Sequence, residues 1–129
     1  MSRQRREPGP DHPITIEAVA RPVNVIADGA TIIDATSYLS LQEARYPAAA
    51  YLPRSAANMD RLERSETTTW CPYKGEAAYF HIRKDDGSLI RDALWTYEAP
   101  FPAVASIKDH LAAYPDRVDA IRIGDGKAD

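Results

Sequence analysis

Short runs of strand-forming residues, separated by turn residues, constrain the fold of this chain more than any other feature. Residues 22–27 and 30–36 are rich in Val and Ile, and Asp28 and Gly29 between them tolerate the positive φ of a hairpin turn. Turn signals recur roughly every eight to twelve residues. The pattern predicts a mainly β protein of short antiparallel strands in a two-sheet, tent-like or barrel-like arrangement. Further extended segments are predicted at residues 37–43, 49–52, 67–69, 76–83, 88–98 and 117–123.

Little helix is expected beside these strands. A short helix within residues 55–64 is favoured, with Ser55 or Asn58 as its N-cap. Residues 103–108 favour a helical turn, and residues 110–114 suit either a strand or a helix. The sequence therefore predicts one or two short helices beside the sheets.

Length and composition indicate a single domain. The chain has 129 residues, of which 44% are hydrophobic, and no apolar run is long enough to span a membrane. We expect the domain at residues 14–123, between a disordered tail at 1–13 and a loose tail at 124–129. Cys71 is the single cysteine, which excludes an intrachain disulfide, and no secretory signal is recognisable, so a cytoplasmic protein is predicted.

The charge and the histidines exclude several classes of partner. A net charge of −3 gives no general electrostatic reason to bind nucleic acid or an acidic membrane. His12, His81 and His110 are scattered and stand beside only one cysteine, so neither a metal site nor a cofactor is expected. No glycine-rich phosphate loop and no nucleophile elbow occur.

The five residues Cys71-Pro72-Tyr73-Lys74-Gly75 are the strongest candidate for a functional centre. Pro72 restricts the backbone of Cys71, and Gly75 permits a sharp bend, so a stiff loop between two strands is predicted. A lysine near a thiol favours the reactive thiolate, although a lone cysteine more often packs as a small hydrophobic residue. Lys74 is a candidate for holding an anion, with a surface lysine as the alternative.

The strand predicted at residues 76–83 alternates in polarity. Ala78, Phe80 and Ile82 share one face, and Tyr79 and His81 lie on the other, less apolar face. His81 is therefore a candidate proton acceptor in a cleft, with a hydrogen-bonded structural histidine as the more common alternative.

The same segments carry a family resemblance. The Thr-x-Cys-Pro-x-Lys-Gly-x-Ala-x-Tyr motif is specific, and over about residues 12–123 the chain resembles the family catalogued as domain of unknown function 427. The matching segments are residues 28–36, Glu43, and residues 51–54, 67–79, 95–100 and 114–118.

What the resemblance implies about function is limited. It implies a small β-rich domain, of the tent-like kind, whose activity is unassigned. A nucleotidyltransferase label has been attached to the family. This chain gives that label no support, because it lacks a Gly-Ser loop followed by strand-borne carboxylates for magnesium.

Three hypotheses about function follow. The first is a small-molecule-binding domain whose pocket surrounds the Cys-Pro-Tyr-Lys-Gly loop and takes a small, partly anionic ligand at Lys74 and Arg54. The second is an enzyme with Cys71 or Lys74 as the reacting group and Glu43 or His81 as proton acceptor. The third is a structural or protein-interaction module, with a homodimer as one form. The predicted ligand-binding residues are Glu43, Tyr51, Pro53, Arg54, Cys71, Lys74, Trp95 and Tyr97.

Overall fold

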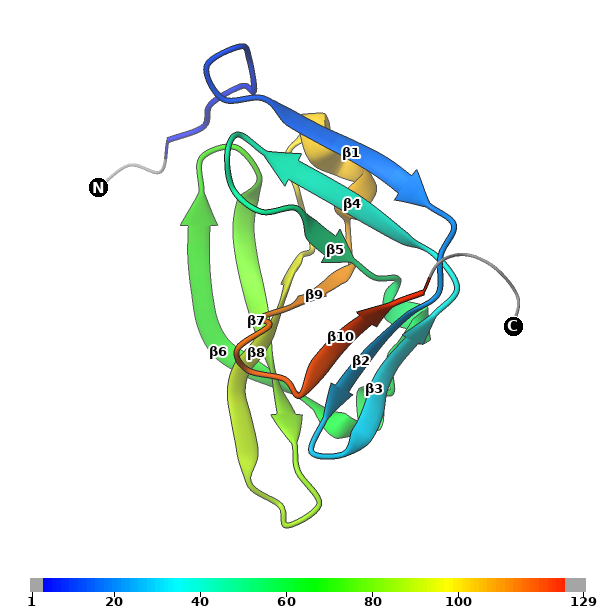
Figure 1. The fold of residues 1–129 in the computed structure, drawn as a ribbon. Helices are drawn as coiled ribbons and strands as arrows, with labels where there is room; N and C mark the ends of the chain where they lie inside the picture. The colour runs from blue at the N-terminus through cyan, green and yellow to red at the C-terminus, as the bar shows by residue number, and fades with distance from the viewer. Residues whose placement is uncertain (1–3, 125–129) are drawn as a thin grey trace.

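A computed structural model describes residues 4–124, whose strands form three antiparallel sheets (Figure 1). The first sheet has the order β1 (Ile14–Val19), β4 (Tyr38–Glu43), β5 (Ala49–Tyr51). The second has the order β10 (Ala120–Ile123), β2 (Val23–Ala27), β3 (Ala30–Ala35). The third has the order β6 (Leu62–Cys71), β7 (Gly75–Arg83), β8 (Leu89–Tyr97), β9 (Leu111–Ala113). The predicted mainly β class is confirmed, and no sheet among these residues closes into a barrel.

The predicted turns form where their residues allow positive φ. Asp28 and Gly29, which join β2 to β3, have φ values of 52° and 70°. Gly87, in the turn between β7 and β8, has a φ of 88°, and the Lys84 N–H donates to the Ser88 carbonyl at 2.8 Å. The hairpins are therefore set by local chemistry.

The helical segments are short 3₁₀ turns: η1 (Arg54–Ala56), η2 (Met59–Arg61) and η3 (Pro102–Ile107). The short helix predicted within residues 55–64 is present as the 3₁₀ turn η2, and a second turn, η1, precedes it. Asn58 does cap η2, since its side chain accepts from the Asp60 N–H at 3.3 Å, but Ser55 lies inside η1. The helix cannot continue because Leu62 begins β6 opposite Ile82 and is buried there. No helix within residues 4–124 is long and apolar enough to cross a membrane.

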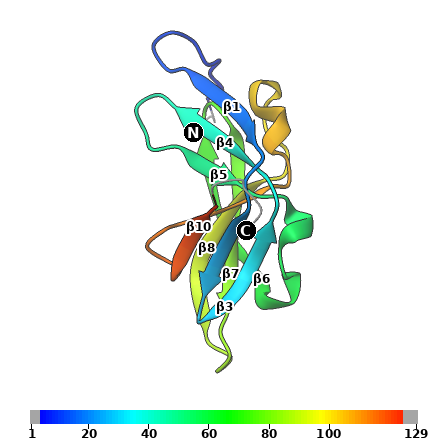
Figure 2. The same cartoon turned by 45° about the vertical axis from the view of Figure 1, so that its right-hand side comes forward.

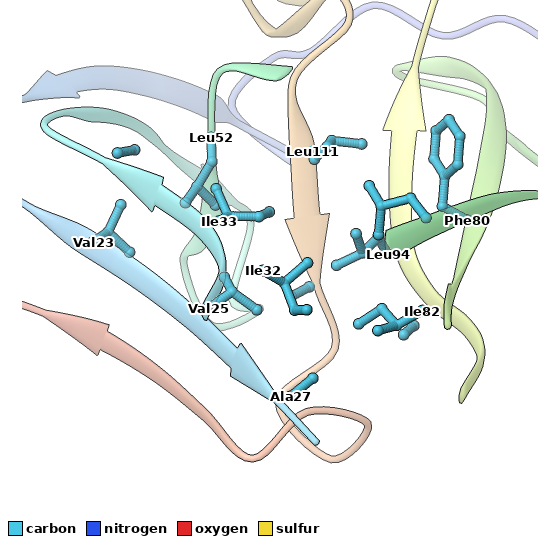
Figure 3. Packing of buried hydrophobic residues seen from close by; sticks show 14 residues of the cluster. Val23, Val25, Ala27, Ile32, Ile33, Leu52, Phe80, Ile82, Leu94 and Leu111 are labelled. Carbon is cyan, nitrogen blue, oxygen red and sulfur yellow. The ribbon is translucent and has the colours of Figure 1, made fainter. Parts of the chain in front are cut away.

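The first hydrophobic core lies between the second and third sheets. Figure 3 shows Val25 and Ile32 facing Leu94 and Ile82 across this space. All four side chains are at most 1% exposed. The face of β7 that carries Phe80 and Ile82 therefore packs on β2 and β3, as its alternation predicts.

A second core covers the opposite face of the third sheet. Tyr79 and Tyr97 pack there against Leu41 of β4 and against Val104 and Ile107 of η3. The segment η3, orange in Figures 1 and 2, lies beside β1 and β4. The face of β7 that the sequence marks as less apolar is therefore buried as well.

The N-terminal segment contacts the domain. The Arg6 N–H donates to the Pro72 carbonyl at 2.8 Å, and the Trp70 indole N–H donates to the Gln4 carbonyl at 2.8 Å. Disorder of the tail at residues 1–13 stays a prediction, and residues 1–3 of it lie outside the described residues. Of the loose tail expected at 124–129, residues 125–129 also lie outside them.

Two arginines from distant segments meet on Glu98, just after β8. Arg64 of β6 binds its carboxylate with two N–H groups at 3.0 and 2.5 Å, and Arg54 of η1 adds a third at 3.2 Å. The pKa of Glu98 is lowered to about 2, and the hydrogen bonds from Arg64 are the largest cause. The cluster therefore ties η1 and β6 to the end of β8.

The Glu98 cluster predicts a pH dependence. Because the folded pKa of about 2 lies below the ordinary pKa of 4.5, the ionised carboxylate stabilises the fold above about pH 4.5, and this contribution is lost as the pH falls toward 2. We expect Glu98→Gln to lower the free energy of unfolding by about 1 kcal/mol near neutral pH, a value reduced for partial exposure. Urea denaturation at several pH values measures the difference, which should vanish near pH 2. Glu17→Gln, at an exposed position, is the matched control, and a difference independent of pH would contradict the prediction.

Candidate functional site

The loop of residues 71–75 joins β6 to β7 and is held on several sides. The Lys74 N–H donates to the Cys71 carbonyl at 3.3 Å, and the Phe101 N–H donates to the Lys74 carbonyl at 3.0 Å. Gly75 has a φ of 111°, a value that favours glycine. The predicted strand, tight loop and strand are confirmed, and the loop directs Lys74 into the protein.

Lys74 forms a buried ion pair with Glu43 at the end of β4. The Lys74 side chain is 9% exposed and that of Glu43 is 15% exposed, and the ammonium donates to Oε1 of the carboxylate. The second oxygen, Oε2, lies 2.7 Å from Nε2 of His12. His12 in turn stacks on Tyr73, with ring centroids 3.9 Å apart and planes 6° from parallel. Three segments far apart in the chain therefore meet at Glu43.

The surroundings of Glu43 keep it ionised. Burial disfavours the carboxylate, but the hydrogen bonds from Lys74 and His12, together with their charges, outweigh burial and lower the pKa of Glu43. The ammonium of Lys74 also lies 5.8 Å from the centroid of the Tyr97 ring. The ammonium and the carboxylate are therefore held in fixed positions at the wall of the site.

A cavity of about 540 Å³, here called the aromatic cavity, opens beside this ion pair. Six of its eleven lining residues carry aromatic rings. They come from β5, β7, β8 and the loops after β4 and β9. The lining residues are Leu41, Glu43, Tyr46, Pro47, Ala49, Tyr51, Lys74, Tyr79, Trp95, Tyr97 and Tyr114.

The aromatic rings are held in a hydrogen-bonded arrangement. The Trp95 indole N–H donates to the Tyr51 hydroxyl at 3.0 Å, and the Thr69 hydroxyl lies 2.8 Å from that of Tyr79. Burial raises the pKa of Tyr51 to about 12, against the opposing effect of the Trp95 N–H, and also raises those of Tyr97 and Tyr114. These hydroxyls therefore stay protonated near neutral pH and can donate to a ligand.

The structure brings five of the eight predicted ligand-binding residues together. These are Glu43, Tyr51, Lys74, Trp95 and Tyr97, all of which line the aromatic cavity. Whether they contact a ligand stays a prediction.

The other three predicted residues lie outside the aromatic cavity. Cys71 is half-buried and packs against the second core, and Pro53 lines a separate groove with Leu39. Arg54 lies on the opposite face of the third sheet, where its guanidinium is 5.4 Å from the centroid of the Phe80 ring and donates to Thr96. Arg54 contacts the face of the third sheet that carries Thr96, whereas Lys74 contacts the face that carries Tyr97, because adjacent strand residues point to opposite faces. Lys74 and Arg54 therefore do not face one common anion.

His81 is also separate from the aromatic cavity. Its Nδ1 accepts the Asp92 backbone N–H at 2.9 Å, and it lines a polar depression together with Thr67 and Asp92. The structure does not bring His81 together with Cys71 or Lys74. This contact is that of a hydrogen-bonded structural histidine, which the sequence offered as the alternative to a proton acceptor.

Sequence reasoning missed four polar or aromatic members of the site. Tyr46 and Tyr114 line the aromatic cavity from loops, and His12 supports Glu43 from 31 residues away. No spacing in the sequence links these residues. Tyr79, the fourth, was within reach, because the alternation of residues 76–83 places it on the less apolar face of the strand.

Among the described residues, no candidate metal site accompanies the aromatic cavity. Within residues 4–124, no three His, Cys, Asp or Glu side chains gather closely enough to hold a metal ion. Glu43 is itself occupied by Lys74 and His12.

The fold and the cavity define a small three-sheet β domain with an aromatic site beside a buried ion pair. The chain belongs to the family described as a domain of unknown function (DUF427), whose model matches residues 15–124. No curated protein matches the chain.

The backbone of Gly75 generates a first prediction for the site. A Cβ at this position would meet the Ala99 carbonyl oxygen at 3.4 Å and would be held at a φ of 111°. We expect Gly75→Ala to lower the free energy of unfolding by about 1–3 kcal/mol, the cost of a strained backbone, as measured by urea denaturation. Gly9→Ala, with no atom within 4 Å of the added Cβ, is the control. Equal stability of the two variants would contradict the role of Gly75.

The ion pair generates a second prediction. Lys74→Met leaves the Glu43 carboxylate without its cation, and Glu43→Gln leaves the ammonium without its anion. We expect each change to lower the free energy of unfolding by about 1–3 kcal/mol, between the values for exposed and buried pairs. The double variant should lose less than the two single variants added together, because both charges are removed. Urea denaturation of the four proteins measures this coupling, and additive losses would show that the two charges do not interact.

Proposed function

We propose that this domain binds a small molecule in the aromatic cavity, with a hydrogen-bond acceptor or anionic group of the ligand against Lys74 and Tyr97. The observation that carries the proposal is the meeting of a buried ammonium and a tyrosine hydroxyl at one cavity. Lys74 and Tyr97 are 7% and 6% exposed, and both line the aromatic cavity. Both side chains are hydrogen-bond donors, so an acceptor supplied by a ligand fits this position.

The donors of the aromatic cavity favour a ligand rich in acceptors. A lysine ammonium carries three N–H groups, and Glu43 accepts one of them, which leaves Lys74 able to donate to a ligand. The tyrosine hydroxyls add neutral donors, since burial raises the pKa of Tyr51 to about 12 and that of Tyr97 as well. A carboxylate or carbonyl group matches this donor set, and the rings of Trp95 and Tyr114, 4.5 Å apart, suit a flat or apolar part.

The same geometry favours binding over catalysis by the residues predicted to react. Cys71 does not line the aromatic cavity, so a ligand held there does not meet its thiol. Lys74 donates to Glu43, and an ammonium in this role has no lone pair with which to attack. The tyrosines stay protonated near neutral pH and supply no phenolate base. No observation favours an enzyme that uses Cys71 or Lys74.

A cytoplasmic location and a homodimer stay predictions. The single cysteine, Cys71, supports a reducing compartment. Light scattering on the purified protein would measure its oligomeric state.

Fluorescence of Trp95 tests the proposal. In a Trp70→Phe background Trp95 is the single tryptophan, and benzoate supplies both an anionic acceptor and a flat ring. We expect benzoate to change the fluorescence in a saturable manner, while benzylamine, a cation of similar shape, does not. The double variant Lys74→Met/Glu43→Gln should weaken benzoate binding about tenfold or more, because a hydrogen bond to a charged group is lost.

A single hydroxyl provides the matched comparison. Tyr97→Phe should weaken benzoate binding about two- to tenfold. Tyr38→Phe makes the same change outside the aromatic cavity and should leave binding unaltered. If benzoate does not saturate, or if binding is the same in the double variant and in the parent, the proposal is wrong.

A further inference from the structure

A second cavity, of about 320 Å³, lies next to the aromatic cavity. We call it the apolar chamber, because all of its lining residues are hydrophobic or proline and none is charged. Four of them are alanines, whose small side chains leave the space open. The lining residues are Pro47, Ala48, Ala49, Ala50, Leu52, Trp95, Ala113, Pro115, Ile121 and Ile123.

The two cavities share a wall. Pro47, Ala49 and Trp95 line both of them, so the Trp95 side chain stands between the apolar chamber and the donors of the aromatic cavity. The polar edge of its indole is bound to Tyr51, a residue that lines only the aromatic cavity. The apolar chamber and the donors of the aromatic cavity therefore meet along this shared wall.

Exposed hydrophobic side chains mark the same region. Among the described residues three large hydrophobic side chains are exposed, and two of them line these cavities: Tyr46, 63% exposed, and Ile123, 46% exposed. Exposed apolar groups gathered at a hollow are typical of binding sites.

We propose that the ligand is amphipathic, with its acceptor group against Lys74 and Tyr97 and an aliphatic chain that passes Trp95 into the apolar chamber. This inference rests on the proposed function and names the class of ligand: a carboxylic acid, or a similar acceptor, that carries a hydrocarbon chain. The chamber offers no hydrogen-bonding side chain beyond the indole already bound to Tyr51, so it suits the chain and not the head group.

The inference predicts a dependence on chain length. Burial of each methylene should tighten binding about fourfold until the chamber is full. Straight-chain carboxylates from propionate to decanoate, used below the concentrations at which they form micelles, provide the series. Trp95 fluorescence in the Trp70→Phe background reports the dissociation constant of each.

Matched variants separate the chamber from the head-group site. Ala50 lines the apolar chamber but not the aromatic cavity, so Ala50→Leu fills the chamber alone. We expect Ala50→Leu to abolish the gain in affinity with chain length and to leave propionate binding unchanged. Ala105→Leu adds the same atoms at an exposed position of η3, outside both cavities, and should behave as the parent does. Urea denaturation of both variants confirms that each is folded.

Three results would overturn the inference in distinguishable ways. Saturable binding that is equally tight for every chain length would remove the apolar chamber from the ligand site and leave the proposed function standing. A full dependence on chain length in Lys74→Met/Glu43→Gln, with affinities equal to those of the parent, would show that the head group is not at Lys74. Failure of both benzoate and every carboxylate to saturate would overturn the proposed function itself.

Discussion

The burial of β7 on both faces is the constraint on which the rest of the structure depends. Alternation along the strand places Phe80 in one hydrophobic core and Tyr79 in the other. A strand buried on both sides needs a layer over each face, and β2–β3 and β4 with η3 provide these layers. The aromatic cavity lies on the Tyr79 side, lined by residues of β4, β5, β7 and β8.

The ion pair between Lys74 and Glu43 connects this framework to the site. Lys74 directly precedes β7 and Glu43 ends β4, so the pair links the third sheet to the first. A buried charge without a partner would be costly, which disfavours other positions for this loop. His12 completes the arrangement and ties the segment before β1 to the same carboxylate. The residues that hold these segments together are therefore also the ones proposed to bind the ligand.

Much of the fold was predictable because its signals are local. The hairpin at Asp28 and Gly29 and the alternation of β7 depend only on turn chemistry and on the period of a strand. The helix expected within residues 55–64 is limited to short 3₁₀ turns for the opposite reason. Its local pattern suits a helix, but Leu62 gains more by pairing with Ile82 and entering the core.

By itself the sequence determined the β class, the tight loop of residues 71–75 and the family of the chain, since neighbouring residues encode all three. Only the tertiary structure decided which motif residues meet. It separated Arg54 from Lys74, although both belong to matching segments, because the two side chains lie on opposite faces of one sheet. It also placed His12 beside Glu43 and formed the apolar chamber beside Trp95. Such contacts depend on how distant strands pack and not on spacing along the chain.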